Sequence, residues 1–258
     1  MPRAAKDTVH TAGSRLPRSF YDRPTLDVAR DLLGKVLVHN RRGVVTSGAI
    51  VEVEAYIGES DPACHAAPGP TARNAPLYGP PGYAYVYLNY GIHCLVNVVT
   101  ESEGSPAAIL IRALEPLDGV DVMRQRRARI AKGRRRREPR AALSAHELCR
   151  GPGNLTMAMG ITLAENRIDL LGPRLYIEDR DLDAGDVAWS PRIGISVGTE
   201  HHWRASIRDR ASVSGRPSPD RDDRRSAESN RRSRESAQTR APGASRSYPA
   251  AEGRDRAR

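Results

Sequence analysis

The chain of 258 residues has little cysteine, lysine or phenylalanine, and it has no long apolar run. Its three cysteines, Cys64, Cys94 and Cys149, are odd in number and far apart, which argues against a disulfide framework and favours a reducing compartment. No stretch of about 18 apolar residues is present, so no transmembrane helix is expected. The N-terminus also lacks the apolar core of a signal peptide. We therefore expect a cytoplasmic protein.

Metal-binding motifs are also missing. There is no Cys-x-x-Cys pair and no His-Glu-x-x-His motif. The two adjacent pairs, Cys64–His65 and His93–Cys94, do not form a natural chelate, because neighbouring side chains of a strand point to opposite faces. The sequence therefore does not favour a zinc site.

Arginine is what the chain has in excess. The 41 basic residues outnumber the 31 acidic ones, for a formal net charge of +10, and only three of the basic residues are lysines. Such a balance suits a polyanionic partner, nucleic acid before a membrane surface, although it can also serve solubility alone. Residues 124–140 hold ten basic residues and one acid, and we expect a mobile surface loop there because like charges repel.

The composition changes after residue 214. Residues 215–258 contain twelve arginines and seven acids but no Leu, Ile, Val, Phe or Met. Such a segment buries too little apolar surface to offset the entropy of ordering, so we expect a disordered arginine-rich tail. Residues 1–16 are expected to form a disordered arm. One domain of residues 17–214 remains.

Hydrophobic patterning within this domain predicts interleaved strands and helices. Helices are expected at 21–35, 117–129 and 151–161, and strands at 35–40, 44–54, 83–88, 93–99, 107–114, 174–179, 192–197 and 203–207. The order is too irregular for repeated βαβ units, so the expected class is α+β.

Tyrosine is concentrated in one region, because six of the nine tyrosines fall within residues 56–90. Tyr83, Tyr85 and Tyr87 alternate along a strand and share a face, where the first two fit a core. Tyr90 lies in the Asn-Tyr-Gly turn that follows. An aromatic protruding from a narrow ribbon is a candidate wedge between base pairs.

Glu54 is the candidate catalytic residue. Glu52 and Glu54 share one face of a strand, which can simply be a solvated face. Glu54, however, is followed by Tyr56 and by a loop rich in Gly and Pro, and a carboxylate beside aromatic side chains can act as a general base. His65, in that loop, can cap a turn or contact a bound base.

Two polar residues interrupt apolar strands. Asn97 lies among valines, where an unpaired amide costs about 1–3 kcal/mol, so it is either a structural hydrogen bonder or a reader of a ligand edge. Arg112, inside Ile-Leu-Ile-Arg-Ala-Leu, needs a counter-charge, which a glutamate or a phosphate would supply.

Several motifs occur together and in order: V-E-V-E-A-Y at 51–56, His65, R-N-A-P at 73–76, G-P-P-G-Y-A-Y-V-Y-L-N-Y-G at 79–91, Asn97, R-A-L-E-P at 112–116, G-P-G-N-L at 151–155 and P-R-I-G-I at 191–195. This series, across residues 17–214, resembles the 3-methyladenine DNA glycosylases of the alkyladenine (methylpurine) type. The resemblance implies a single α+β domain around a curved, mostly antiparallel sheet with a protruding β-hairpin. It also implies the absence of any metal or organic cofactor.

The resemblance further assigns roles. Glu54 matches the glutamate that activates the attacking water. Tyr56, His65 and Tyr87 match the residues that sandwich a flipped base. Tyr90 matches the residue that intercalates in the minor groove.

Two more positions follow from the same resemblance. Asn97 matches the residue that disfavours normal guanine, and Arg112 the arginine near Glu54 and the flipped nucleotide. The implied protein is an enzyme of base excision repair that acts on damaged purines in double-stranded DNA. Because the lysines lie far in sequence from these motifs, we expect a monofunctional hydrolase, and we expect it to be monomeric and nucleoid-associated. Ala205 stands where the family tends to have a large aromatic, and His201-His202 where a proline is usual, which leaves the packing of the last strand open.

Two other functions remain open at this point. A non-catalytic nucleic-acid-binding protein could use the tyrosines as a stacking platform, and a small-molecule transferase could use a similar sheet. The substrate range among 3-methyladenine, 7-methylguanine, hypoxanthine and ethenoadenine is not fixed by the sequence.

Overall fold

A computed structural model describes residues 13–133 and 143–215, which belong to one compact unit, Met1–Arg216. Residues 1–12 of the expected arm and almost all of the expected tail lie outside the described residues. Residues assigned to the end of the arm do join the domain. Ser14 and Arg15 form a strand, and Leu16 is buried, with its backbone N–H donating to the carbonyl of Ile177 at 3.0 Å.

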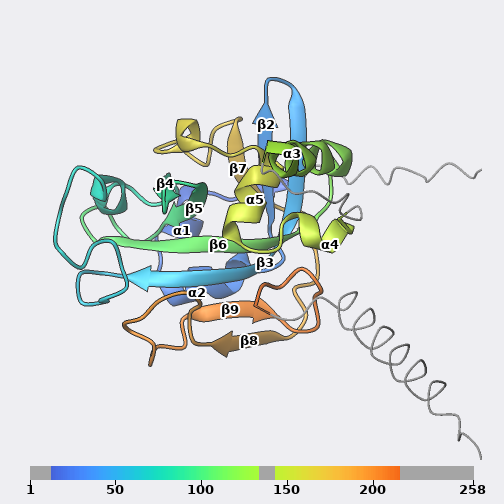
Figure 1. The fold of residues 1–258 in the computed structure, drawn as a ribbon. Coiled ribbons are helices and arrows are strands. Elements are labelled where there is room, and N and C mark those ends of the chain that lie inside the picture. Colours follow the sequence, from blue (N-terminus) through green and yellow to red (C-terminus); the bar gives the residue numbers. More distant parts are fainter. Residues whose placement is uncertain (1–12, 134–142, 216–258) are drawn as a thin grey trace, which may run out of the picture. The chain divides into compact units, whose positions relative to one another are not determined.

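Strands and helices are interleaved irregularly along the described part of the chain (Figure 1). The elements, in chain order, are β1 (Ser14–Arg15), α1 (Arg18–Tyr21), α2 (Thr25–Leu32), β2 (Val36–Arg41), β3 (Val44–Ile57), η1 (Ala75–Tyr78), β4 (Ala84–Asn89), β5 (His93–Val99), β6 (Ala107–Pro116), α3 (Val120–Gly133), α4 (Ala145–Leu148), α5 (Pro152–Met159), η2 (Leu163–Glu165), β7 (Leu175–Asp179), β8 (Val187–Ser190) and β9 (Arg204–Ile207).

The strands form one curled antiparallel sheet. The order is β1-β7-β2-β3-β6-β5-β4, and β9 pairs with both β3 and β8. At 14 residues, β3 is long enough to pair with β2 over residues 44–49, with β6 over residues 48–57 and with β9 over residues 52–54. The predicted class, a single α+β domain around a curved antiparallel sheet, is confirmed.

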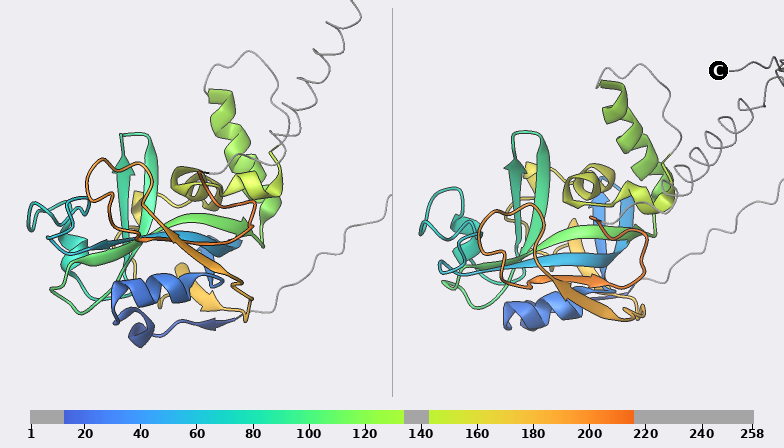
Figure 2. Two further views of the ribbon diagram at one scale, coloured as in Figure 1. Left: turned by 90° about the horizontal axis from the view of Figure 1, so that it is seen from below. Right: turned by 60° about the horizontal axis from the view of Figure 1, so that its bottom comes forward.

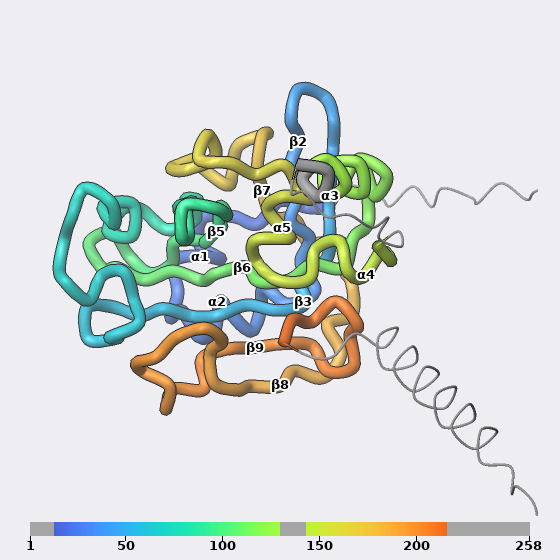
Figure 3. The backbone as a smooth tube through the Cα atoms, in the orientation of Figure 1, coloured from blue at the N-terminus to red at the C-terminus, as the bar shows by residue number. Residues whose placement is uncertain are grey.

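Helices cover both faces of this sheet. Helix α2 packs on β3 and β6 from one side, while α5 packs on β5 and β6 from the other. The β4–β5 hairpin projects from the face opposite α1 and α2 (Figure 2). The long loop at 58–83 and the segment at 191–203 lie at the same end of β3 and β6, and both can be followed in the tube of Figure 3.

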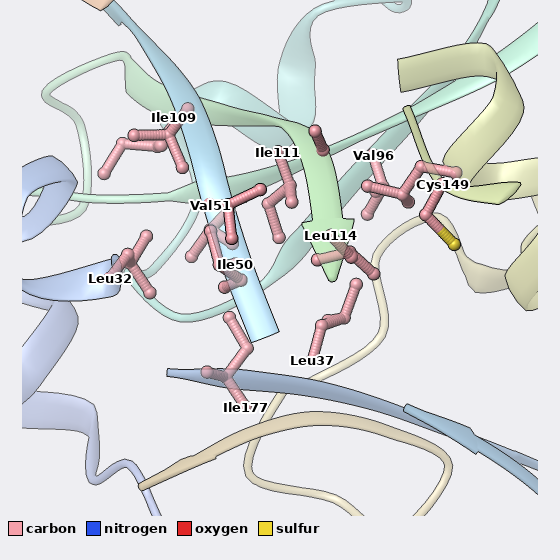
Figure 4. Close-up of a cluster of buried hydrophobic side chains, with 14 of the residues drawn as sticks. Leu32, Leu37, Ile50, Val51, Val96, Ile109, Ile111, Leu114, Cys149 and Ile177 are labelled. Carbon is pink, nitrogen blue, oxygen red and sulfur yellow. The ribbon is translucent and has the colours of Figure 1, made fainter. Parts of the chain in front are cut away.

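Apolar side chains from both helices and strands meet in the main core. Figure 4 shows Leu32 of α2, Leu37 of β2, Ile50 of β3, Ile111 of β6 and Ile177 of β7 converging. Each of these side chains is completely buried. Burial of such a side chain stabilises the fold by about 1.5–3 kcal/mol, so this cluster fixes the sheet that carries the site.

Two predicted elements differ from the structure. The helix expected at 21–35 is present but shorter, as α2 at Thr25–Leu32, because Pro24 at its N-cap position disfavours helical geometry in the residue before it. The strand expected at 192–197 is wrong: this segment is irregular, and β8, which precedes it, was not predicted. The Arg192 side chain enters a buried ion pair, which takes the place of strand pairing.

The basic run was expected to be a mobile surface loop. The prediction is wrong up to Gly133, where α3 ends, and residues 134–140 lie outside the described residues. Arginines of α3 donate to main-chain carbonyls: Arg126 to Met159 at 2.6 Å and Arg127 to Leu148 at 2.5 Å. These acceptors lie at the C-terminal ends of α5 and α4, where cations are favoured, so the arginines join helices rather than repel one another.

The last strand does form. Ala205 is fully buried in β9, opposite Val53 of β3 on one side and Trp189 of β8 on the other. Trp189 packs against the main core. No helix of the described residues is both long and apolar enough to cross a membrane.

Candidate active site

An irregularity in the pairing of β3 with β6 positions the charged side chains of the site. The strand register shifts between Ile50 and Glu52 and again between Glu52 and Val53. The second shift leaves Arg112 of β6 as an extra residue between the partners of Glu52 and Val53. Bulges re-aim side chains, and here the Arg112 guanidinium reaches both Glu52 and Glu54. The counter-charge expected for Arg112 is therefore a pair of glutamates.

Strand register brings three polar residues into one row across the sheet. Glu54 of β3 is opposite Leu110 of β6, Leu110 is opposite Asn97 of β5, and Asn97 is opposite Tyr85 of β4. Side chains opposite one another across a sheet share a face. Glu54, Asn97 and Tyr85 therefore belong to the same surface of the sheet.

Glu54 is fully buried and accepts three hydrogen bonds. Its Oε2 accepts from the Tyr56 hydroxyl at 2.9 Å and from Arg112 Nη1 at 3.0 Å. Among the described residues, only the backbone N–H of Ile193 donates to its Oε1, at 2.7 Å. Because each carboxylate oxygen has two lone pairs, Oε1 keeps one acceptor position free for a further donor such as water.

Glu52 lies two residues away and has a different environment. Arg112 Nε, Arg204 Nε and the Ser214 hydroxyl donate to Oε1 at 3.0, 2.7 and 2.8 Å, and the Ser214 N–H donates to Oε2 at 2.6 Å. Burial raises the pKa of Glu52, but Arg112, Arg204 and the Ser214 N–H outweigh it, so its net pKa is below the ordinary value. Glu52 is thus the fixed counter-ion of the arginines.

Aromatic side chains pack together at the Tyr85 end of the row that contains Glu54. The rings of His65 and Tyr87 lie 4.5 Å apart, those of Tyr85 and Tyr87 5.3 Å apart, and His65 Nδ1 shares a 2.8 Å hydrogen bond with the Tyr85 hydroxyl. Burial, followed by the charge of Arg73, lowers the pKa of His65, so the ring is neutral at pH 7. Burial is also the main cause that raises the pKa of Tyr87 to about 12.

The loop that carries His65 is held by the amide of Asn74, in the Arg-Asn-Ala-Pro motif. Asn74 Nδ2 donates to the carbonyls of His65 at 2.7 Å and Gly69 at 2.9 Å, while Oδ1 accepts from the N–H of Thr71 at 2.6 Å. Asn74 is itself buried. These bonds fix the backbone at His65 without regular secondary structure.

The structure brings Glu54, Tyr56, His65, Tyr87, Asn97 and Arg112 together and leaves Tyr90 apart. Asn97 is buried and donates to the carbonyl of Tyr85 at 3.0 Å.

Tyr90, at the tip of the β4–β5 hairpin, is 88% exposed, and its φ of 48° is unusual for a residue other than glycine. Its neighbours Leu88 and Ile92 are also exposed, which gives the tip an apolar surface.

Sequence reasoning overlooked four residues that complete this site: Asp61, Arg192, Arg204 and Ser214. Each is distant in sequence from the residue it contacts. The Pro-Arg-Ile-Gly-Ile motif at 191–195 was the available signal for Arg192.

Known proteins give an independent comparison. A profile of the methylpurine-DNA glycosylase (MPG) family matches residues 19–211. A protein from Methanocella arvoryzae is 47% identical over 205 residues, which cover 78% of this chain and 96% of that protein. One from Burkholderia lata is 45% identical over 206 residues, covering 79% and 92%, and one from Chlorobaculum tepidum is 43% identical over 195 residues, covering 75% and 87%. Each of the three is named "Putative 3-methyladenine DNA glycosylase". The predicted resemblance is confirmed, and this chain belongs to the methylpurine-DNA glycosylase family.

Proposed function

We propose that this protein is a monofunctional DNA glycosylase that flips alkylated purines out of duplex DNA and hydrolyses their N-glycosidic bond. One observation carries the proposal: Glu54, buried beside aromatic rings, keeps a free acceptor position on Oε1 while three donors fix the carboxylate. A carboxylate held in this way can orient a water molecule and accept its proton.

The reaction follows from this arrangement. The oxygen of a water bound at Glu54 attacks C1′ of the flipped nucleotide, and the water proton passes to the carboxylate. The bond between C1′ and the purine breaks, and its electron pair leaves with the base. A general base contributes about 10²–10⁴-fold in rate, and the negative charge of Glu54 also stabilises the positive charge that develops on the sugar.

Contacts among the aromatic rings support a position for the base. His65 and Tyr87 are in contact, so they are proposed to form one wall, with Tyr56 as the opposite wall. Stacking contributes about 1–3 kcal/mol per base, against a flipping cost of a few kcal/mol that is smallest for a damaged base. The faces of the tyrosines also favour an electron-poor, cationic purine.

Two further residues are proposed to select the damaged base and to help extrude it from the duplex. Asn97, in the same row as Glu54, is proposed to disfavour the exocyclic amine of guanine. Tyr90 is proposed to enter the minor groove and fill the space of the extruded nucleotide. The proposed substrates are 3-methyladenine first, with 7-methylguanine, hypoxanthine and ethenoadenine as further candidates.

A covalent mechanism would need an amine near the sugar. Lys35, the lysine whose side chain the structure describes, forms an ion pair with Asp179 at the β2–β7 side of the sheet. We therefore propose simple hydrolysis, which leaves the abasic strand intact.

The test is base release from methylated duplex DNA by the wild-type protein and by Glu54→Gln. We expect the wild type to release 3-methyladenine and to leave a strand that breaks only in alkali. Glu54→Gln should bind the same duplex and lose at least about 10²-fold in the single-turnover rate.

Two other results would contradict the proposal. DNA binding without base release from any damaged duplex would favour a stacking platform without catalysis. Indifference to DNA would favour the small-molecule transferase.

A further inference from the structure

Arg192 and Asp61 form an ion pair beside the site. Asp61 lies in the loop after β3, and Arg192 follows β8, 131 residues later. Both side chains have no exposed surface. Two parallel hydrogen bonds join them, from Nη1 to Oδ2 at 2.6 Å and from Nη2 to Oδ1 at 2.8 Å. This bidentate geometry is specific to arginine, because lysine offers only a point charge.

The same pair binds the backbone of three segments. Arg192 Nη1 also donates to the carbonyl of Ala55 at 3.0 Å, and Nη2 to that of Gly198 at 3.2 Å. Asp61 accepts from the N–H groups of Ile57 at 3.3 Å and Ala63 at 3.0 Å. The end of β3, the loop leading to His65 and the segment at 192–198 therefore meet at one ion pair.

Two connections link this ion pair to Glu54, and each involves a residue adjacent in sequence to Glu54 or to Arg192. Ala55, which accepts from Arg192, lies between Glu54 and Tyr56 in β3. Ile193, which follows Arg192, supplies the one N–H from the described residues that binds Oε1 of Glu54, the oxygen with the free acceptor position. The guanidinium carbon of Arg192 also lies 4.7 Å from the centre of the Tyr56 ring.

We propose that Arg192, held by Asp61, is a positioning residue that orients the Glu54 carboxylate and the Tyr56 ring for hydrolysis. The inference rests on the proposed function. Anchoring of the guanidinium fixes the peptide that carries the Ile193 N–H, and this donor sets the direction of the free lone pair on Oε1. Arg192 covers one face of Tyr56 and leaves the other for the base.

A purely structural role for Arg192 is the alternative. The loss of rate, compared with the loss of stability, distinguishes a positioning role from a structural one. Weakening a buried ion pair lowers stability wherever the pair lies, because it leaves a buried charge less well compensated. Positioning, in contrast, is sensitive to small displacements, since an error of about 1 Å at a reacting group can lower the rate about 10²-fold.

The experiment compares Arg192→Lys with a matched control, Arg180→Lys. The Arg180 side chain is also buried and paired with two carboxylates, Asp118 at 2.8 Å and Glu178 at 2.6 Å, but it lies beyond β7, away from Glu54. Three quantities are measured for each folded variant: the urea unfolding midpoint, the Kd for a duplex with one damaged purine, and the single-turnover rate of base release at saturating enzyme.

We expect both variants to lose stability and to keep their Kd. Only Arg192→Lys should lose rate, by about 10- to 100-fold. A third variant, Gly198→Ala, keeps both charges, but its new Cβ would lie 2.9 Å from Arg192 Nη2, and the φ of 62° adds backbone strain that the unfolding midpoint measures. It should reduce the rate in the same direction if the position of the guanidinium matters.

Coupling to Glu54 gives the decisive readout. Glu54→Asp draws the carboxylate back from the Ile193 N–H, so Arg192→Lys should have little further effect in that background. An unchanged rate in Arg192→Lys, or rate losses that multiply in the double variant, would overturn the inference. A wild-type protein that releases no base would instead refute the proposed function, so the two failures can be told apart.

Discussion

At the scale of single residues, two glutamates of the same strand illustrate how contacts separate roles. Glu52 accepts four hydrogen bonds, three of them at one oxygen, and Arg112 and Arg204 compensate its charge. Glu54 accepts three and keeps one acceptor position free. Among the described residues, Glu52 Oε2 also has only one donor, so the surroundings make the difference. Arg112, Arg204 and Ser214 enclose Glu52 and, against the effect of burial, lower its pKa, which makes it a weaker base, whereas Glu54 lies beside the Tyr56 hydroxyl and suits the role of general base.

Tyr90 allows stability and function to be separated. Its side chain is 88% exposed, so Tyr90→Ala should change the free energy of unfolding by no more than about 0.5 kcal/mol. The same change removes the proposed wedge and should reduce extrusion of the base. Urea unfolding and the fluorescence of a duplex that carries ethenoadenine would measure the two effects.

Val44→Ala is the matched control for Tyr90→Ala. Val44 is also an exposed apolar residue near a hairpin tip, but it lies at the start of β3, in the β2–β3 hairpin. We expect its substitution to leave extrusion unchanged. Equal extrusion by the wild type and Tyr90→Ala would show that the tip does not act as a wedge.

The site was only partly predictable at this scale. Residues within short motifs, such as Glu54 and Tyr56, were recognised because their neighbours along the chain were informative. Asp61 and Ser214 were overlooked, because their significance comes from partners 131 and 162 residues away. The full burial of Glu52 had no local signal either, since its arginine partners belong to β6 and β9.

At the scale of elements, strand alternation predicted most of the sheet, and side-chain contacts explain the failures. The segment at 192–197 has strand-like alternation but is fixed by Arg192 and by the contact of Ile193 with Glu54. Helix α3 extends into the basic run because carbonyls of α4 and α5 accept from its arginines. In both places tertiary contacts override a local preference.

The β8–β9 pair gives the prediction for this scale. Trp189 lies opposite the fully buried Ala205, and we expect it to fill the space that a large aromatic at 205 would occupy. Trp189→Ala should destabilise the protein by about 2 kcal/mol, less than the 3–5 kcal/mol typical of a fully buried Trp. Ala205→Phe alone should cost about 1–3 kcal/mol through overpacking.

Combining the two substitutions tests whether Trp189 and a Phe at position 205 would occupy the same space. If Trp189 fills the space beside Ala205, the double variant should lose less stability than the sum of the single variants. Urea unfolding midpoints measure all three. Additive losses would mean that the two side chains do not share one space.

At the scale of the whole molecule, the candidate site ends near residue 215, and a basic segment follows it. Ser214 donates to Glu52, accepts from Arg112 Nη2 at 3.2 Å and from Arg204 Nη2 through its carbonyl at 3.0 Å. Val213 beside it is fully buried. The following residues, 216–258, contain twelve arginines and seven acids, a net charge of 12 − 7 = +5, which is half of the +10 of the chain.

Two truncations that differ by four residues should therefore behave differently. Removal of 216–258 leaves Ser214 in place, so the single-turnover rate at saturating enzyme should be unchanged. Affinity for undamaged duplex should fall, and the slope of log K against log salt should decrease by up to about 4.5 if each net charge meets a phosphate. Removal of 212–258 also deletes the Ser214 contacts with Glu52 and the buried Val213, so stability and rate should both fall. Loss of single-turnover chemistry in the shorter deletion would show that the basic segment takes part in the reaction and does not only attract DNA.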